Sequence, residues 1–326
     1  MKIIFFGTPS FAATTLKFLI DNGHEISAIV SAPDSRKGRG KQLQETEVKK
    51  LAINEKITIL QPLNLKDPDF VKKLKSFHVD LFVVVAFRML PEIVWKIPGK
   101  GTINLHTSFL PNYRGAAPLN RVLINGESKT GVTTFFINEK IDAGQIIMQE
   151  QVALNENITA AQLHNILMKK GSVLLNNTIN AIEKNKFKQI IQSHSTTMKN
   201  APKITKDLLR IDWSKTAIDI HNLIRGLSPV LDNENLLKDV AICPSAWFLL
   251  QDDKGKNKRI KLQLTKLSPV TKTAHLSIDT DNSSYLKINV KDLSLNILRL
   301  QIEGKTSMNI KQFLQGNKIN RNFKVL

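Results

Sequence analysis

The chain has 326 residues, a length that predicts two domains, and its content of 42% hydrophobic and 23% charged residues is typical of a folded globular protein. The single cysteine excludes internal disulfides and argues against a cysteine-based metal site, and no apolar run approaches the roughly 20 residues that cross a bilayer. The formal net charge of +19 suits a polyanionic partner, although a lysine-rich composition of the kind that AT-biased genomes encode explains it equally well.

The first half of the chain alternates apolar, strand-like runs with segments of helical spacing. The expected strands are Lys2–Phe6, Glu25–Ser31, Ile57–Gln61, Asp80–Ala86, Gly101–His106 and Gly131–Ile137. The expected helices are Ser10–Asn22, Glu45–Glu55, Asp67–Phe77 and Ala117–Ile124. Continuous apolar strands separated by helices indicate a Rossmann-type, mostly parallel α/β sheet covered on both faces. Ligands of such sheets bind at the carboxyl ends of the strands.

The turn after the first strand, FFGTPSFA, lacks the pattern of a dinucleotide site. A dinucleotide fingerprint needs three glycines at fixed spacing so that the backbone can approach a pyrophosphate, and this turn has only Gly7. No GKS or GKT phosphate loop occurs anywhere in the chain. The sheet is therefore expected to bind neither NAD nor ATP at this turn.

The pattern changes after a strand at Gln145–Leu154 and a long helix at Thr159–Lys184. A polar, Ser/Thr-rich stretch follows, and then an amphipathic helix that ends near Gly226. Five short strands come next, at Ala246–Leu250, Arg259–Leu267, Ala274–Ile278, Tyr285–Val290 and Leu295–Glu303. They predict a second, small antiparallel β-barrel of OB-like type. We expect an N-terminal domain at 1–191, a linker at 192–206 and a C-terminal barrel at 207–326.

Polar side chains stand at the end of the fifth apolar strand. Asn104 and His106 are two residues apart, so they emerge on the same face of that strand. A carboxamide can donate to a developing oxyanion, and an imidazole can donate or shuttle a proton. Asp142 lies in a tight Asp-Ala-Gly turn, where its carboxylate could orient His106 or accept a proton through water. Each residue alone has a common structural explanation, but N-x-H, S-F-L-P, R-G-A-A-P and I-D-A-G together favour a catalytic site.

Two clusters of positive side chains accompany this pattern. One occupies a glycine-containing loop after the second strand, and such a loop suits a segment that orders on a polyanion. The other lies in the predicted barrel, and a solvated basic surface is the ordinary alternative for both. The residues are Arg36, Lys37, Arg39 and Lys41 in the loop, and Lys256, Lys258 and Arg259 in the barrel.

The stretch NLHTSFLPNYRGAAPLNRVLINGESKTGVTTFF, with IDAGQII after it, resembles the methionyl-tRNA formyltransferases of the folate-dependent formyltransferase family. The FGTP turn, the RKGRGKQL loop, the VVVAF strand and the APKI and IDW segments extend the resemblance over nearly the whole chain. It implies transfer of the formyl group of 10-formyltetrahydrofolate to the α-amino group of L-methionyl initiator tRNA. The product would be formylmethionyl-tRNA for translation initiation, and no metal is expected.

The resemblance also implies roles for particular residues. Asn104, His106 and Asp142 match the catalytic trio of the family. Ser108, Phe109, Leu110 and Pro111 match its folate-contacting loop, with Phe109 in place of a leucine, and Val84, Ala86, Phe87 and Arg88 would line the pterin pocket. The basic loop would contact the acceptor stem of the tRNA, and the basic barrel residues would grip its phosphates. Residues 1–191 would then be the catalytic domain and 207–326 the tRNA-binding domain.

Three alternatives stay open at this point. Another folate-dependent formyltransferase, acting on glycinamide ribonucleotide or an amino sugar, would share the trio but would not need the basic loop. A folate hydrolase would also use the trio. A non-catalytic RNA-binding protein would tolerate loss of the trio, yet all three residues are present. In every case we expect a cytoplasmic monomer without membrane contact, and the insertion after Pro229 affects only the local geometry of the barrel.

Overall fold

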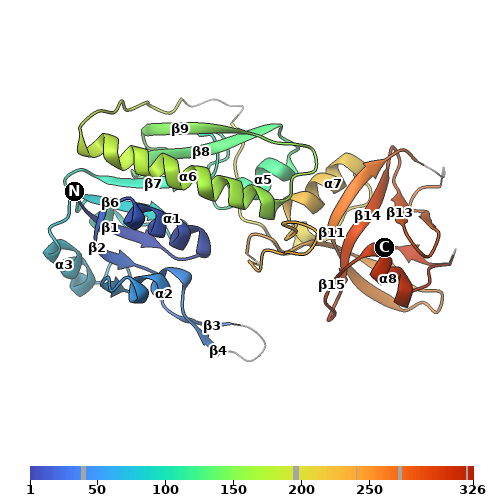
Figure 1. Ribbon diagram of the computed structural model, residues 1–326. Helices are drawn as coiled ribbons and strands as arrows, with labels where there is room; N and C mark the ends of the chain where they lie inside the picture. Colours follow the sequence, from blue (N-terminus) through green and yellow to red (C-terminus); the bar gives the residue numbers. More distant parts are fainter. Residues whose placement is uncertain (38–41, 194–197, 240, 271–273, 321) are drawn as a thin grey trace. The chain divides into compact units, whose positions relative to one another are not determined.

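The computed structural model describes residues 1–37, 42–193, 198–239, 241–270, 274–320 and 322–326 (Figure 1). The chain divides into two compact units, neither of which is one continuous segment. The α/β unit consists of Met1–Gly115, Thr130–Val152 and Ile166–Asn200, and the β unit of Ala116–Lys129, Ala153–Asn165 and Ala201–Leu326. Across the described ranges no helix is both long enough and apolar enough to cross a bilayer. The functional domain boundaries expected at residues 191 and 206 stay a prediction.

A seven-stranded sheet forms the α/β unit, in the order β5-β2-β1-β6-β7-β8-β9. Its strands are β1 (Lys2–Gly7), β2 (Glu25–Val30), β5 (Ile59–Leu60), β6 (Leu81–Val85), β7 (Thr102–His106), β8 (Lys129–Phe136) and β9 (Ile146–Ala153). The pairs from β5 to β7 are parallel, and β8 runs antiparallel to β7. This arrangement confirms the predicted mostly parallel α/β sheet.

Helices cover both faces of this sheet. They are α1 (Ser10–Asp21), α2 (Glu47–Asn54), α3 (Pro68–Ser76), α4 (Glu92–Trp95) and α6 (Ala160–Glu183). One face carries Ile4 and Phe82, which pack in a buried cluster with Leu74 of α3 and Val94 of α4. Alternate residues point to the other face, where Gly171 of α6 lies so close to Leu105 of β7 that a Cβ would stand 2.9 Å from its side chain. Burial on both sides explains the continuously apolar strands.

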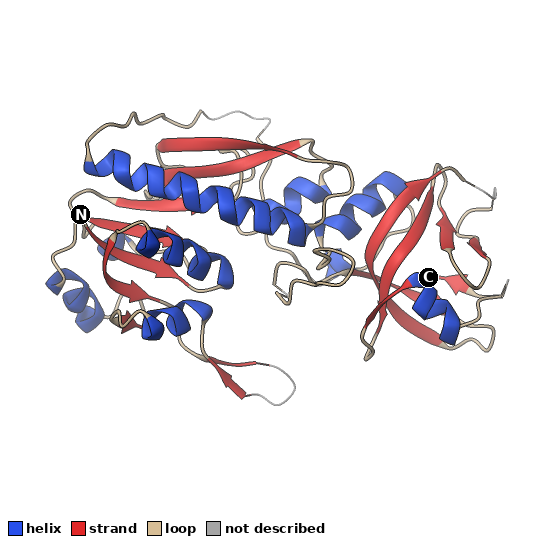
Figure 2. Ribbon diagram, viewed as in Figure 1, coloured by secondary structure: helices blue, strands red, loops and turns tan. Residues whose placement is uncertain are grey.

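A curled antiparallel sheet forms the β unit, in the order β12-β13-β14-β11-β10-β16, with β15 paired to β14 (Figure 2). Its strands are β10 (Ala246–Gln251), β11 (Asn257–Ser268), β12 (Ile278–Thr280), β13 (Leu286–Asn289), β14 (Ser294–Ile302), β15 (Ser307–Asn309) and β16 (Lys324–Val325). Its helical segments are α5 (Pro118–Ile124), η1 (Asp207–Leu209), α7 (Ala217–Gly226) and α8 (Ile310–Gly316). The register shifts between β11 and β14, as expected where a sheet bends. The predicted small barrel is confirmed as a half-barrel.

Helix α7 buries His221 in the core of the β unit. The Nε2 of His221 donates to the carbonyl oxygen of Glu156 at 3.2 Å, and its Nδ1 accepts from the hydroxyl of Thr265 at 3.0 Å. Desolvation lowers the pKa of this imidazole, the bond to the Glu156 backbone opposes that effect, and the nearby Arg225 adds to it. The folded protein therefore keeps His221 neutral at a pH where the unfolded chain already binds a proton.

Acid is consequently expected to destabilise the protein through His221. Because histidine in an unfolded chain titrates near pH 6.5, stability should fall as the pH drops through that value and level off below the lowered folded pKa. The melting temperature of the parent should fall more between about pH 7.5 and about pH 5.5 than that of His221→Gln, since glutamine takes up no proton. His164, whose pKa burial also lowers, contributes to both proteins. Equal falls in both proteins would contradict this coupling.

Candidate active site

The carboxyl end of β7 presents Asn104 and His106 on one face. In the sheet Asn104 lies opposite Val84 of β6 and Phe135 of β8. Leu105, between the two polar residues, points to the face that α6 covers. The period-two alternation of the strand thus places the apolar side chain on one face and the two polar side chains on the other.

The imidazole of His106 is held by the backbone of a neighbouring loop. His106 is only 6% exposed, and its Nε2 lies 2.9 Å from the carbonyl oxygen of Tyr113. Because a carbonyl can only accept, Nε2 carries the proton and donates it, so that Nδ1 of the neutral ring has a free lone pair. Nδ1 lies 3.8 Å from Oδ2 of Asp142, too far for a direct hydrogen bond. The Tyr113 carbonyl therefore orients the ring, and the Asp142 carboxylate faces Nδ1.

Asp142 itself is fixed in an unusual backbone conformation. Its φ of 51° lies in the left-handed region, which non-glycine residues adopt rarely and where Asp and Asn are favoured. Its Oδ2 accepts a hydrogen bond of 2.9 Å from the backbone N–H of Gly115. Its carbonyl oxygen accepts one of 2.9 Å from the side chain of Gln192. Both the carboxylate and the backbone of Asp142 therefore have defined partners.

The loop after β7 carries four predicted folate contacts, and only one of these side chains is exposed. Ser108 is fully buried and its hydroxyl donates to the carbonyl of Asn112 at 2.7 Å, so it shapes the loop. Leu110 is buried with Phe135 and Ile146, and Pro111 is half-buried. Phe109 is 41% exposed. Phe109 is therefore the side chain of this loop best placed to contact a ligand.

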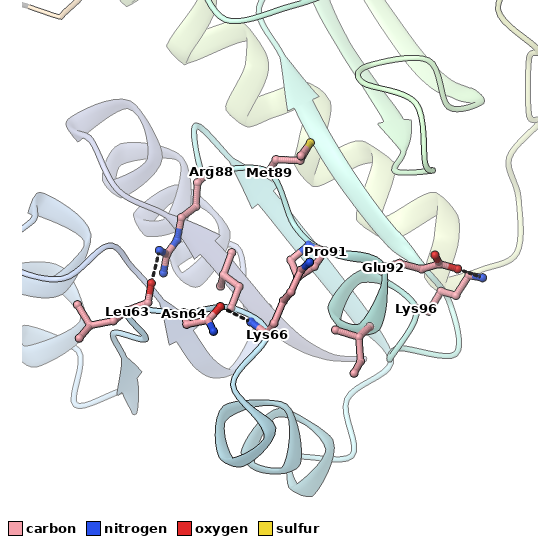
Figure 3. Close-up of a pocket in the computed structure, with 10 residues that line it drawn as sticks. Leu63, Asn64, Lys66, Arg88, Met89, Pro91, Glu92 and Lys96 are labelled. Carbon is pink, nitrogen blue, oxygen red and sulfur yellow. Dashed lines mark hydrogen bonds and ion pairs between the residues drawn. The ribbon is translucent and has the colours of Figure 1, made fainter.

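Strand β6 and the segment after it hold the other predicted folate contacts. Val84 is buried in the core, whereas Ala86 is exposed with a φ of 47°. Phe87 packs edge-on against Phe6, with ring centroids 5.7 Å apart. Arg88 points towards the 62–63 loop, where its guanidinium donates to the carbonyl of Leu63 at 2.9 Å (Figure 3). It also donates to the carbonyl of Pro62. Partial burial lowers the pKa of Arg88, and its side chain acts as a tie between two loops.

A pocket of about 870 Å³ lies beside this segment (Figure 3). Exposed apolar side chains and three cations line it. The described lining residues are Leu63, Asn64, Leu65, Lys66, Arg88, Met89, Pro91, Glu92, Ile93 and Lys96. Arg88 is the one predicted site residue among these lining residues, and none of the three predicted catalytic residues is among them. The pocket therefore neighbours the strand ends without containing the candidate catalytic groups.

The described basic residues fall on two hairpins. Arg36 and Lys37 lie on β3 (Ser35–Lys37), which pairs antiparallel with β4 (Gln42–Gln44), while Arg39 and Lys41 lie outside the described residues. Lys256 is exposed in the turn between β10 and β11, and Lys258 is half-buried on β11. The guanidinium of Arg259 lies 3.8 Å from the ring centroid of Trp247 and 3.4 Å from Glu303. Arg259 is thus already engaged within the fold.

The structure adds three residues that the sequence did not single out as site residues. Arg114 is the first residue of the R-G-A-A-P motif and Tyr113 directly precedes it, so the motif marked this loop without assigning these roles. Gln192 falls at the start of the segment expected to be a linker, and no pattern in the sequence marks it. All three contact His106 or Asp142 of the predicted catalytic trio, directly or through one another.

Known protein families and relatives match nearly the whole chain. A family model described as formyl transferase matches residues 1–179, and one described as formyl transferase, C-terminal domain, matches residues 203–318. The chain is 40% identical over 316 residues to the methionyl-tRNA formyltransferase of Flavobacterium johnsoniae, covering 97% of this chain and 96% of the relative. It is 40% identical over 320 residues to that of Clostridioides difficile, covering 98% of each. The crystal structure of WlaRD, a sugar 3N-formyl transferase, in the presence of dTDP and 5-N-formyl-THF has a TM-score of 0.63 at 21% identity, covering 94% of this chain and 99% of WlaRD.

Proposed function

The chain belongs to the formyltransferase family, and from that we propose that it formylates the α-amino group of L-methionyl initiator tRNA with 10-formyltetrahydrofolate as the donor. Methionyl-tRNA is proposed as the acceptor because the chain is 40% identical to methionyl-tRNA formyltransferases over nearly the full length of both chains. The proposed formyl-transfer chemistry is supported by the arrangement of Asn104, His106 and Asp142 at one edge of the sheet.

His106 would act first as a base. Its Nδ1 has a free lone pair in the neutral ring, because Nε2 donates to Tyr113, and it can take the proton of the attacking amine. The carboxylate of Asp142, 3.8 Å away, would stabilise the imidazolium so formed. The new Nδ1–H can then pass the proton towards N10 of the leaving folate. Asn104 would donate its amide N–H to the oxyanion of the tetrahedral intermediate.

The residues near the strand ends fit an aromatic donor. The exposed ring of Phe109, the exposed thioether of Met89 and the exposed backbone at Ala86 offer apolar surface and hydrogen-bonding groups of the kind that small-molecule sites combine. The donor supplies an activated formyl group when bound. Phe109 and the segment at Val84, Ala86, Phe87 and Arg88 would hold its ring system, while Ser108, Leu110 and Pro111 would keep the loop in place.

The acceptor would be held through its phosphates. The hairpin at Arg36 and Lys37, together with Arg39 and Lys41, would contact the acceptor stem, and Lys256 and Lys258 would bind phosphates non-specifically. Arg259 would contribute less, because it is engaged with Trp247 and Glu303. Within this proposal the protein works as a cytoplasmic monomer.

A comparison of acceptors tests the proposal. The protein is given 10-formyltetrahydrofolate with initiator methionyl-tRNA, elongator methionyl-tRNA or a dTDP-linked amino sugar, and the formylated products are quantified. We expect formylation of the initiator with a kcat/KM at least tenfold above that of the elongator, and none of the sugar. Since WlaRD is a sugar 3N-formyl transferase of the same fold, preferential formylation of the amino sugar would overturn the proposed acceptor while keeping the family.

A further inference from the structure

Three consecutive residues of one loop fix the candidate catalytic groups. The carbonyl of Tyr113 accepts from Nε2 of His106, and the backbone N–H of Gly115 donates to Oδ2 of Asp142. Both Tyr113 and Gly115 have positive φ, of 62° and 122°, so the carbonyl and the N–H are turned to these partners by the backbone itself. The middle residue, Arg114, is connected to the Asp142 turn through the side chain of Gln192.

Gln192 connects Arg114 to the backbone on either side of the Asp142 turn. Its Oε1 accepts from Nε and from a terminal nitrogen of Arg114, at 3.0 and 2.6 Å. Its Nε2 donates to the carbonyl of Asp142 at 2.9 Å and to that of Gly144 at 2.7 Å. Gln192 is 5% exposed, and all four of these contacts lie within the α/β unit. A buried amide with every contact satisfied is a rigid connector.

The segment that carries Gln192 is itself anchored on both sides. Two residues earlier, Ile190 exchanges a pair of backbone hydrogen bonds with Ile146 at the start of β9, at 2.8 and 2.9 Å. Further along, the carbonyl of Lys199 accepts from the backbone N–H of Tyr113 at 2.6 Å. Gln192 and Lys199 therefore link the turn that holds Asp142 to the loop that holds His106.

We infer that Gln192 is a positioning residue for the formyl-transfer reaction, which sets the Asp142 carboxylate opposite Nδ1 of His106 by holding the backbone of the Asp142 turn. This inference rests on the proposed function. Glutamine suits the role chemically, because a single amide must accept from a cation and donate to two carbonyls at once. A carboxylate of the same shape would keep the bond to Arg114 but would repel the carbonyls of Asp142 and Gly144.

Gln192→Glu is therefore the discriminating variant. We expect kcat for initiator formylation to fall about 10- to 100-fold, because a displacement of about 1 Å at a catalytic group costs up to about 100-fold. The KM of both substrates should stay within about twofold and the melting temperature near that of the parent, since the new carboxylate pairs with Arg114. Gln162→Glu is the matched control: Gln162 also joins a backbone N–H to a backbone carbonyl, at Thr159 and Leu231, but within the β unit. It should retain parental kcat.

Coupling to Asp142 separates positioning from general support of the fold. In an Asp142→Ala background, measured with enzyme in excess, Gln192→Glu should cost less than about twofold, because there is no carboxylate left to position. A full 10- to 100-fold cost in that background, or a fall in melting temperature without a fall in kcat, would overturn the inference. If the parent formylates no acceptor, the proposed function fails instead. An active parent with an equally active Gln192→Glu variant would refute only the positioning role.

Discussion

Replacing His106 by alanine is expected to lower kcat for formyl transfer by about 10²- to 10⁴-fold, the range that a positioned acid–base group contributes. In the proposed mechanism the variant would lose both the Nδ1 lone pair that takes the proton of the amine and the Nδ1–H that returns it. The KM of both substrates should change little, because the buried ring contacts Tyr113 and Asp142 and contributes little to the ligand-binding surface. Initial rates at saturating donor and varied methionyl-tRNA measure the effect.

The matched control for this variant is His78→Asn. His78 is exposed and has a φ of 47°, a conformation that asparagine tolerates. It should retain the parental kcat. This result would show that the fall in kcat of His106→Ala is not caused by the loss of just any histidine. A kcat of His106→Ala within fivefold of the parent, in a protein with an unchanged melting temperature, would refute the assignment of His106 as the acid–base group.

Substituting Gly144 by alanine is expected to damage both stability and catalysis. A Cβ at this position would lie 1.6 Å from the carbonyl oxygen of Phe136, a backbone atom of β8 that cannot rotate aside. The Asp142 turn would have to move away from β8, breaking the bond from Gln192 to the Gly144 carbonyl. We expect a loss of about 1–3 kcal/mol in the free energy of unfolding, as for overpacked sites, and a fall of at least about tenfold in kcat. Urea unfolding and steady-state kinetics measure the two effects.

Gly99→Ala provides the comparison for Gly144→Ala. Apart from Gly99 and its two chain neighbours, no described residue has a heavy atom within 4 Å of a Cβ built on Gly99, and its φ is outside the left-handed region. The free energy of unfolding of this variant should match or slightly exceed that of the parent, because alanine restricts the unfolded chain. A Gly144→Ala protein as stable and as active as Gly99→Ala would show that the Asp142 turn does not depend on its approach to β8.

The sheet of the α/β unit followed from local pattern to a large extent. The run predicted at Gly101–His106 is β7 at Thr102–His106, because a strand buried on both faces is apolar throughout and stops where polar residues begin. The strand expected at Ala274–Ile278 was misplaced: β12 begins at Ile278, since the backbone from Ala274 to Ser277 closes a turn before the pairing with Ile288 starts. Pairing partners, and not propensity alone, set such short strands.

The candidate site was predictable only in part, because local sequence pattern places some of its residues and not others. Strand alternation places Asn104 and His106 together, and this needs only residues two apart. The approach of Asp142 to His106 followed from the family pattern, and the structure gives it as 3.8 Å. The role of Gln192 depends on the path of a chain segment 50 residues beyond Asp142, which no local periodicity encodes. The same holds for Arg88, whose tie to Leu63 links two loops.

The most direct test of the proposed formyl transfer follows the formyl carbon itself. The parent protein is mixed with initiator methionyl-tRNA and 10-formyltetrahydrofolate labelled in the formyl carbon, and the label is traced in the amino acid released from the tRNA and in free formate. We expect the label to appear in formylmethionine in proportion to the folate consumed, with little in formate. Release of the label as formate, with methionine left unmodified, would contradict it and identify a folate hydrolase instead.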